Sequence, residues 1–185
     1  MGVFCEGPDR EACFQRIAAA LILIRQHDPS TFTRIRTRFS GILVFGNERY
    51  RLAYWKHSGR LCVITVRYIL SPESSPEDLA LTLAHEAMHA RLFDLGDEYI
   101  EGRRARIEVI CAMAELALAR QLPESRALVE QAEHRIQDFA STSETHWSSA
   151  TARTEEFRYL REMGAPRWML SIVDRLNRLV TKRAA

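Results

Sequence analysis

Residues Leu79–Phe93 read LALTLAHEAMHARLF, and this stretch organises the rest of the chain. Its apolar residues cover most of the circumference of a helix, which predicts that the helix is largely buried. His85 and His89 are four residues apart, so on a helix their imidazoles lie on one face, one turn apart. Two histidines and Glu86 in a buried helix need an explanation, because polar groups without partners are costly in a core. Coordination of a metal ion is the simplest one.

The four residues SPED, at positions 75–78, predict where this helix begins. The serine offers a capping hydroxyl, the proline suits the first helical position, and the two acids suit the positive end of the helix dipole. The HExxH spacing then indicates metal-assisted hydrolysis. His85 and His89 can reach one ion, while Glu86 projects to the side, where it can hydrogen-bond a water molecule at the metal.

Composition is that of a globular protein. The chain has 185 residues, of which 46% are hydrophobic, and this suits one domain with a sizeable core. The net charge of +2 gives no reason to expect nucleic-acid binding. The longest apolar run, residues 17–24, is too short to span a bilayer, and the N-terminus does not resemble a signal peptide. Four widely spaced cysteines without a CxxC pair are expected to be free thiols, so we expect a cytoplasmic protein that binds neither membranes nor nucleic acid.

The first 70 residues predict a helix followed by a small antiparallel sheet. Residues 9–27 place apolar side chains at helical spacing. The next segments are rich in β-forming residues and joined by short turns with glycine, which predicts three or four antiparallel strands at 32–39, 41–45, 50–55 and 61–69. An edge strand beside the histidine helix could pair with an extended peptide, and whether the last of these strands is that edge stays open.

The second half of the chain is expected to be helical, which makes the fold class α+β. Helices are predicted at residues 103–121, 123–141, 146–163 and 166–182. Without a repeat or a low-complexity linker, we expect a single domain over residues 1–185. Its core would span about residues 9–122, and the C-terminal helices at 123–182 would offer a surface for a partner.

A catalytic zinc needs a third protein ligand and one open position for water. The metzincin pattern has a third histidine six residues after the second one, and this chain has Leu95 there, which excludes that class. A glutamate from a second helix is the remaining common solution. Glu108 follows His89 after eighteen intervening residues. Glu115, about two turns later on the same helix, is its rival.

The chain resembles the gluzincin metallopeptidases in one pattern: an HExxH motif followed, after eighteen residues, by a glutamate on a helix. The order of helix, sheet, histidine helix and glutamate helix is similar to minimal zincins of the stress-response and phage-repressor-cleaving type. The resemblance covers roughly residues 60–122. It implies that His85, His89 and Glu108 bind Zn2+, that Glu86 is the general base, and that the substrate is a peptide or protein.

The chain departs from the gluzincin pattern beyond the three ligands. Gluzincins often carry an aspartate four residues after the ligand glutamate, which orients a histidine, and this chain has Ala112 there. Candidates for that supporting role are Asp94, Asp97 and Glu98. Candidates for a stabiliser of the transition state are Tyr99 and His146.

We therefore expect a zinc-dependent hydrolase, and within that class a metallopeptidase. One alternative is a metal-stabilised binding or regulatory protein without turnover, whose working surface is the C-terminal helical part. A fourth metal position closed by a protein group such as His146 would favour this alternative. Another alternative is an α+β domain in which HExxH occurs by accident, and metal analysis would separate it from the others.

Overall fold

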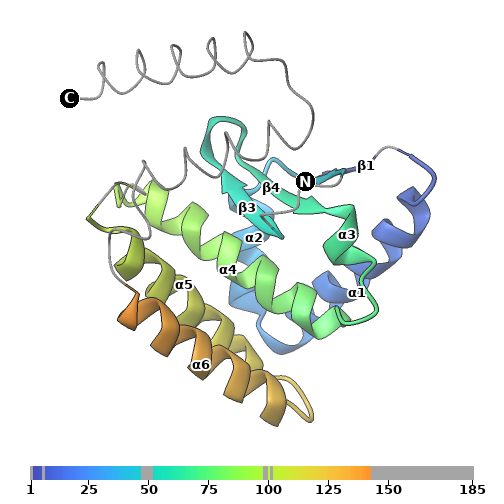
Figure 1. Ribbon diagram of the computed structural model, residues 1–185. Coiled ribbons are helices and arrows are strands. Elements are labelled where there is room, and N and C mark those ends of the chain that lie inside the picture. The colour runs from blue at the N-terminus through green and yellow to red at the C-terminus, as the bar shows by residue number, and fades with distance from the viewer. Residues whose placement is uncertain (1, 6, 47–51, 98–99, 101, 143–185) are drawn as a thin grey trace, which may run out of the picture. The chain divides into compact units, whose positions relative to one another are not determined.

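The computed structural model describes residues 2–5, 7–46, 52–97, 100 and 102–142 (Figure 1). All of them belong to one compact unit, residues 1–142. The helices predicted at 146–163 and 166–182 lie outside the described residues, so the single domain over residues 1–185 and the C-terminal partner surface stay predictions. Within the described part, no helix combines the length and the apolar character needed to cross a membrane.

The predicted α+β class is confirmed. The strands are β1 (Gly2–Cys5), β2 (Gly41–Phe45), β3 (Ala53–Lys56) and β4 (Leu61–Thr65). The helices are α1 (Arg10–His27), α2 (Pro29–Arg38), α3 (Val66–Ile69), α4 (Pro76–Asp94), α5 (Arg104–Ala119) and α6 (Arg126–Ser141), with a short 3-10 turn, η1, at His57–Gly59. The predicted helices at 9–27, 75–93, 103–121 and 123–141 thus correspond to α1, α4, α5 and α6.

The sheet is mixed, so the prediction of an antiparallel sheet is correct only for one pair of strands. The strand order is β1-β2-β4-β3, in which β1–β2 and β2–β4 are parallel and β3–β4 is antiparallel. Parallel neighbours need a long connection, and α1 and α2 provide it between β1 and β2. Because β4 is an inner strand, the edges of this described sheet are β1 and β3.

Residues 32–39 do not form the predicted strand, because α2 occupies most of this stretch. Their threonine and isoleucine content favoured a strand. The preceding residues decide otherwise: Asp28 caps the helix by accepting a hydrogen bond from the Thr31 backbone N–H at 2.9 Å, and Pro29 starts its first turn. The predicted strand at 61–69 is likewise shorter, since Thr65 caps α3 after β4 ends.

Loss of the Asp28 cap should destabilise the fold. We expect Asp28→Ala to lower the free energy of unfolding by about 1 kcal/mol at neutral pH, measured by thermal unfolding. Burial opposes the charge of this carboxylate, but hydrogen bonds from Thr31 and Ser30 outweigh burial and lower its pKa. A carboxylate whose pKa is lower in the folded than in the unfolded state stabilises the fold at pH values above its unfolded pKa. This stabilisation is lost as the pH falls through the folded pKa. The difference from the unmodified chain should therefore shrink below about pH 4.

Asp28→Asn is the control for this prediction, because asparagine caps helices about as well as aspartate. It should retain most of the stability at neutral pH. Equal unfolding temperatures for Asp28→Ala and the unmodified chain would contradict the capping role.

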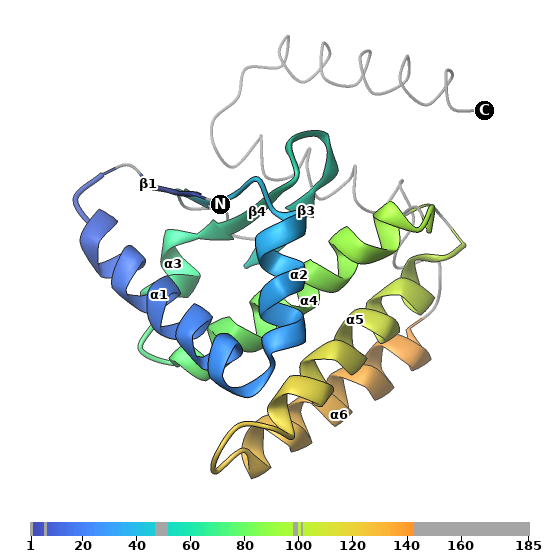
Figure 2. The ribbon, with the colours of Figure 1, turned by 180° about the vertical axis from the view of Figure 1, so that it is seen from behind.

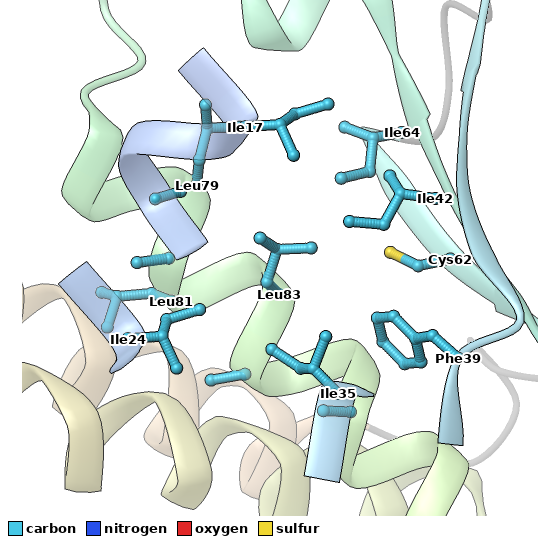
Figure 3. Close-up of a cluster of buried hydrophobic side chains, with 14 of the residues drawn as sticks. Ile17, Ile24, Ile35, Phe39, Ile42, Cys62, Ile64, Leu79, Leu81 and Leu83 are labelled. Atoms are coloured by element: carbon cyan, nitrogen blue, oxygen red, sulfur yellow. The ribbon is translucent and has the colours of Figure 1, made fainter. Parts of the chain in front are cut away.

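Helix α4 is the central helix of the fold. It contacts α1 and α2 on the side of the sheet and α5 on another side, and α5 in turn contacts α6 (Figures 1 and 2). Its leucines enter the main core with isoleucines of the neighbouring elements (Figure 3). The fully buried members of this core include Ile17, Ile24, Ile35, Ile42, Ile64, Leu79 and Leu83. Packing therefore fixes α4 on its leucine face, while its histidines face α5.

Candidate metal centre

The predicted start of α4 is confirmed. The Ser75 hydroxyl accepts from the Asp78 backbone N–H at 3.0 Å, and the Asp78 carboxylate accepts from the Ser75 backbone N–H at 2.9 Å, which makes a capping box. Farther along the first half of the helix, the Tyr68 hydroxyl lies 2.8 Å from the Thr82 hydroxyl. These contacts hold the helix in place one turn before the HExxH residues.

The two histidines of α4 and one glutamate of α5 converge on a point between the helices. Nε2 of His85 lies 3.1 Å from Nε2 of His89 and 3.1 Å from Oε2 of Glu108. Oε1 of Glu108 lies 3.6 Å from Nε2 of His89. The three side chains are between 11% and 13% exposed, so the point where they meet is sheltered but not sealed.

These distances fit a zinc ion. Zinc binds histidine nitrogen and carboxylate oxygen at about 2.0–2.2 Å, which puts neighbouring donors of a tetrahedral site about 3.4 Å apart. The two histidine nitrogens are 3.1 Å apart, and Glu108 approaches them with different oxygens, Oε2 at 3.1 Å from His85 and Oε1 at 3.6 Å from His89, so all three separations are close to that value. Two nitrogens and one carboxylate are also a donor set that zinc accepts in hydrolases.

The hydrogen bonds of His85 also favour a positive charge at this point. Its Nδ1 lies 2.5 Å from Oε1 of Glu115, and a carboxylate can only accept, so Nδ1 carries a proton. In the neutral ring, Nε2 then presents a lone pair to Glu108, which is an acceptor as well. Two facing acceptors repel unless a proton or a metal cation lies between them. Burial disfavours a charged ring, but the hydrogen bonds to Glu108 and Glu115 outweigh it and raise the pKa of His85 to about 10.

Glu115, the rival third ligand, lies on the other side of His85. It contacts Nδ1 rather than Nε2, is 1% exposed, and accepts a hydrogen bond from Arg135 of α6. It therefore contacts the His85 ring at the nitrogen that faces away from Glu108, where a partner fixes the orientation and tautomer of the ring. The signal that could have identified it is the seven-residue spacing from Glu108, which places both glutamates on one helix face.

The other candidates from the sequence lie elsewhere or cannot be placed. Asp94 pairs with Arg38 and with Arg60, the latter at 3.1 Å. Asp97 lies 3.4 Å from Arg103. The candidates Glu98, Tyr99 and His146 lie outside the described residues.

Glu86 is buried, and its Oε2 has no hydrogen-bond partner among the described residues. Burial raises its pKa, although His89 and His85 oppose this shift. A buried carboxylate oxygen without a partner is costly, and a polar molecule such as water at the metal centre would relieve that cost. A carboxylate with a raised pKa is also a better proton acceptor than an exposed one.

Cys111 is a further donor that the sequence pattern did not suggest. One ligand atom each from His85, His89 and Cys111 lie within 4.8 Å of one another. Cys111 follows Glu108 by three residues on α5, and this spacing, which puts both on one face, could have pointed to it. Burial raises the pKa of its thiol, and the nearby Glu108 adds to the shift, so the thiol keeps its proton unless a cation displaces it.

No protein-family model, no curated protein and no solved structure matches this chain. The case for a metal centre therefore depends on the side chains themselves. These side chains are the HExxH residues of α4 and the two glutamates and the cysteine of α5. The distances among their donor atoms support the metal centre.

Proposed function

We propose that the chain is a zinc-dependent hydrolase that acts on a peptide or protein. The observation that supports this most is the convergence of His85, His89 and Glu108: the two ring nitrogens are 3.1 Å apart, and the two carboxylate oxygens lie 3.1 and 3.6 Å from them. These three residues would hold the ion. Three protein ligands leave the fourth position of a tetrahedral site open, which is the arrangement of catalytic zinc.

The side chains around the site have complementary roles in hydrolysis. A bound zinc ion lowers the pKa of water to about 7 and polarises a carbonyl group. Glu86 would accept a proton from the attacking water and then donate it to the leaving amine. Glu115 would hold the proton of His85 on Nδ1 and leave the lone pair of Nε2 available for a bound ion.

An extended peptide is the substrate class that the sheet favours. β3 is an edge strand of the described sheet and contacts α4, the helix that carries the histidines. An edge strand presents backbone donors and acceptors with which an extended chain can pair. We also propose a cytoplasmic location, since the four cysteines are buried, form no disulfide and would stay reduced there.

Cys111 favours a second candidate function, a metal-stabilised binding or regulatory protein without turnover. If its thiolate joined His85, His89 and Glu108, four protein donors would complete a tetrahedral site and leave no position for water. Closed sites of this kind are structural rather than catalytic. The two candidates therefore differ in one property, whether the fourth position is open.

Substitution with cobalt(II) separates the two candidates without knowledge of the substrate. A cobalt-bound thiolate absorbs in the near-ultraviolet, and an open position binds acetohydroxamate, which changes the visible spectrum. The proposed hydrolase should lack the thiolate band and respond to acetohydroxamate. A strong thiolate band that disappears in Cys111→Ser, with no response to acetohydroxamate, would reject the hydrolase and favour the second candidate.

A further inference from the structure

Helix α6 reaches the candidate metal centre through one charged side chain. Arg135 of α6 donates from Nη1 to Oε2 of Glu115, and Oε1 of the same carboxylate lies 2.5 Å from Nδ1 of His85. A continuous series of contacts thus leads from α6 through α5 to α4. In Figure 2, α5 lies between α4 and α6, in agreement with the contacts of these helices.

The position of Glu115 makes these contacts consequential. Its side chain is 1% exposed, so its charge cannot be screened by water and must be matched by protein groups. Arg135 holds one carboxylate oxygen and His85 holds the other. With both oxygens fixed, the carboxylate plane is fixed, and so is the direction in which it holds the His85 ring.

We propose that Arg135 is a positioning residue of the metal centre. Acting through Glu115, it keeps Nε2 of His85 directed at His89 and Glu108, so that the packing of α6 sets the affinity for the ion. This inference assumes, from the proposed function, that the centre binds zinc. It adds that a residue outside the helices of the ligands controls how tightly zinc is bound.

The test is the zinc affinity of the full chain, measured in competition with a chromophoric chelator. Arg135→Met keeps much of the side-chain length and removes the charge, and Arg135→Gln is a milder change if Arg135→Met does not fold. Loss of outer partners of ligand histidines typically costs 10–100-fold in metal affinity. Because Arg135 acts one residue farther out, we expect a loss of about tenfold, at the lower end of that range.

The chain offers a matched control in Arg120→Met. Arg120, the residue that follows α5, also contacts α6, through Glu133 at 3.1 Å, but both side chains are exposed, and in the described part of the chain neither hydrogen-bonds to Glu115 or His85. This variant should keep the affinity of the unmodified chain. Thermal unfolding of the metal-free proteins should give a lower temperature for Arg135→Met than for Arg120→Met, because Arg135→Met leaves Glu115 buried without its cation. Zinc affinities are therefore compared at a temperature at which circular dichroism shows both variants fully folded, which excludes general unfolding as the cause of weaker binding.

A double-variant cycle tests whether Arg135 acts through Glu115. Glu115→Gln should weaken zinc binding by itself, and adding Arg135→Met should weaken it no further. The inference is overturned if Arg135→Met and Arg135→Gln bind zinc as tightly as the unmodified chain, if Arg120→Met loses as much affinity, or if the two losses add in full. An unmodified chain that binds no zinc would overturn the proposed function together with this inference.

Discussion

Glu86→Gln is expected to lower peptide hydrolysis by about 10²–10⁴-fold while the zinc stays bound. Glutamine preserves the size of the side chain but cannot accept a proton from water. Glu86 is not one of the three residues whose donor atoms converge, so its replacement should leave the metal ligands unchanged. The measurement is cleavage of a degenerate peptide mixture, followed by mass spectrometry, together with the zinc content of the same samples.

Glu77→Gln is the matched control for this variant. It makes the same chemical change in the same helix, but in the first turn of α4, two turns before the first histidine. It should cost at most about 1 kcal/mol in stability, from the loss of a charge at the helix N-terminus, and nothing in hydrolysis. Undiminished hydrolysis by zinc-loaded Glu86→Gln would contradict the assignment of Glu86 as the general base.

Glu108→Gln should have the second largest effect, a loss of zinc affinity of at least about 100-fold. Removing an outer-shell partner costs 10–100-fold, and a direct ligand should cost more than that. The matched variant is Cys111→Ser, which alters a buried thiol three residues farther along α5 and should leave the affinity nearly unchanged. The reverse pattern, a large loss in Cys111→Ser and a small one in Glu108→Gln, would show that the thiol is the third ligand.

Local signals in the sequence were sufficient for most helices. The capping box and the apolar pattern predicted α4, and the similar patterns of α1, α5 and α6 were found with small errors at their ends. The prediction was wrong at α2, where two local signals disagreed. The β-branched residues favoured a strand, while Asp28 and Pro29 favoured the start of a helix, and the prediction followed the β-branched residues. Strand direction was also missed, because β1 is short and its parallel partner β2 follows only after two helices.

The candidate site could be anticipated where spacing along one helix decides the geometry. The four-residue spacing of His85 and His89 anticipated their shared face, and the eighteen-residue gap pointed to Glu108 on the next helix. The supporting contacts could not be anticipated in this way. The packing of three helices decides which nitrogen of His85 contacts Glu115. It also decides that Arg135 of α6 contacts the same carboxylate.

The most direct test of the metal centre is the zinc content of the full chain after zinc loading and removal of free metal, measured by plasma mass spectrometry. We expect about one zinc per chain. The double variant His85→Ala, His89→Ala, verified as folded by circular dichroism, should hold none. An unmodified chain without zinc, or a folded double variant that retains as much zinc as the unmodified chain, would contradict the metal centre formed by His85, His89 and Glu108.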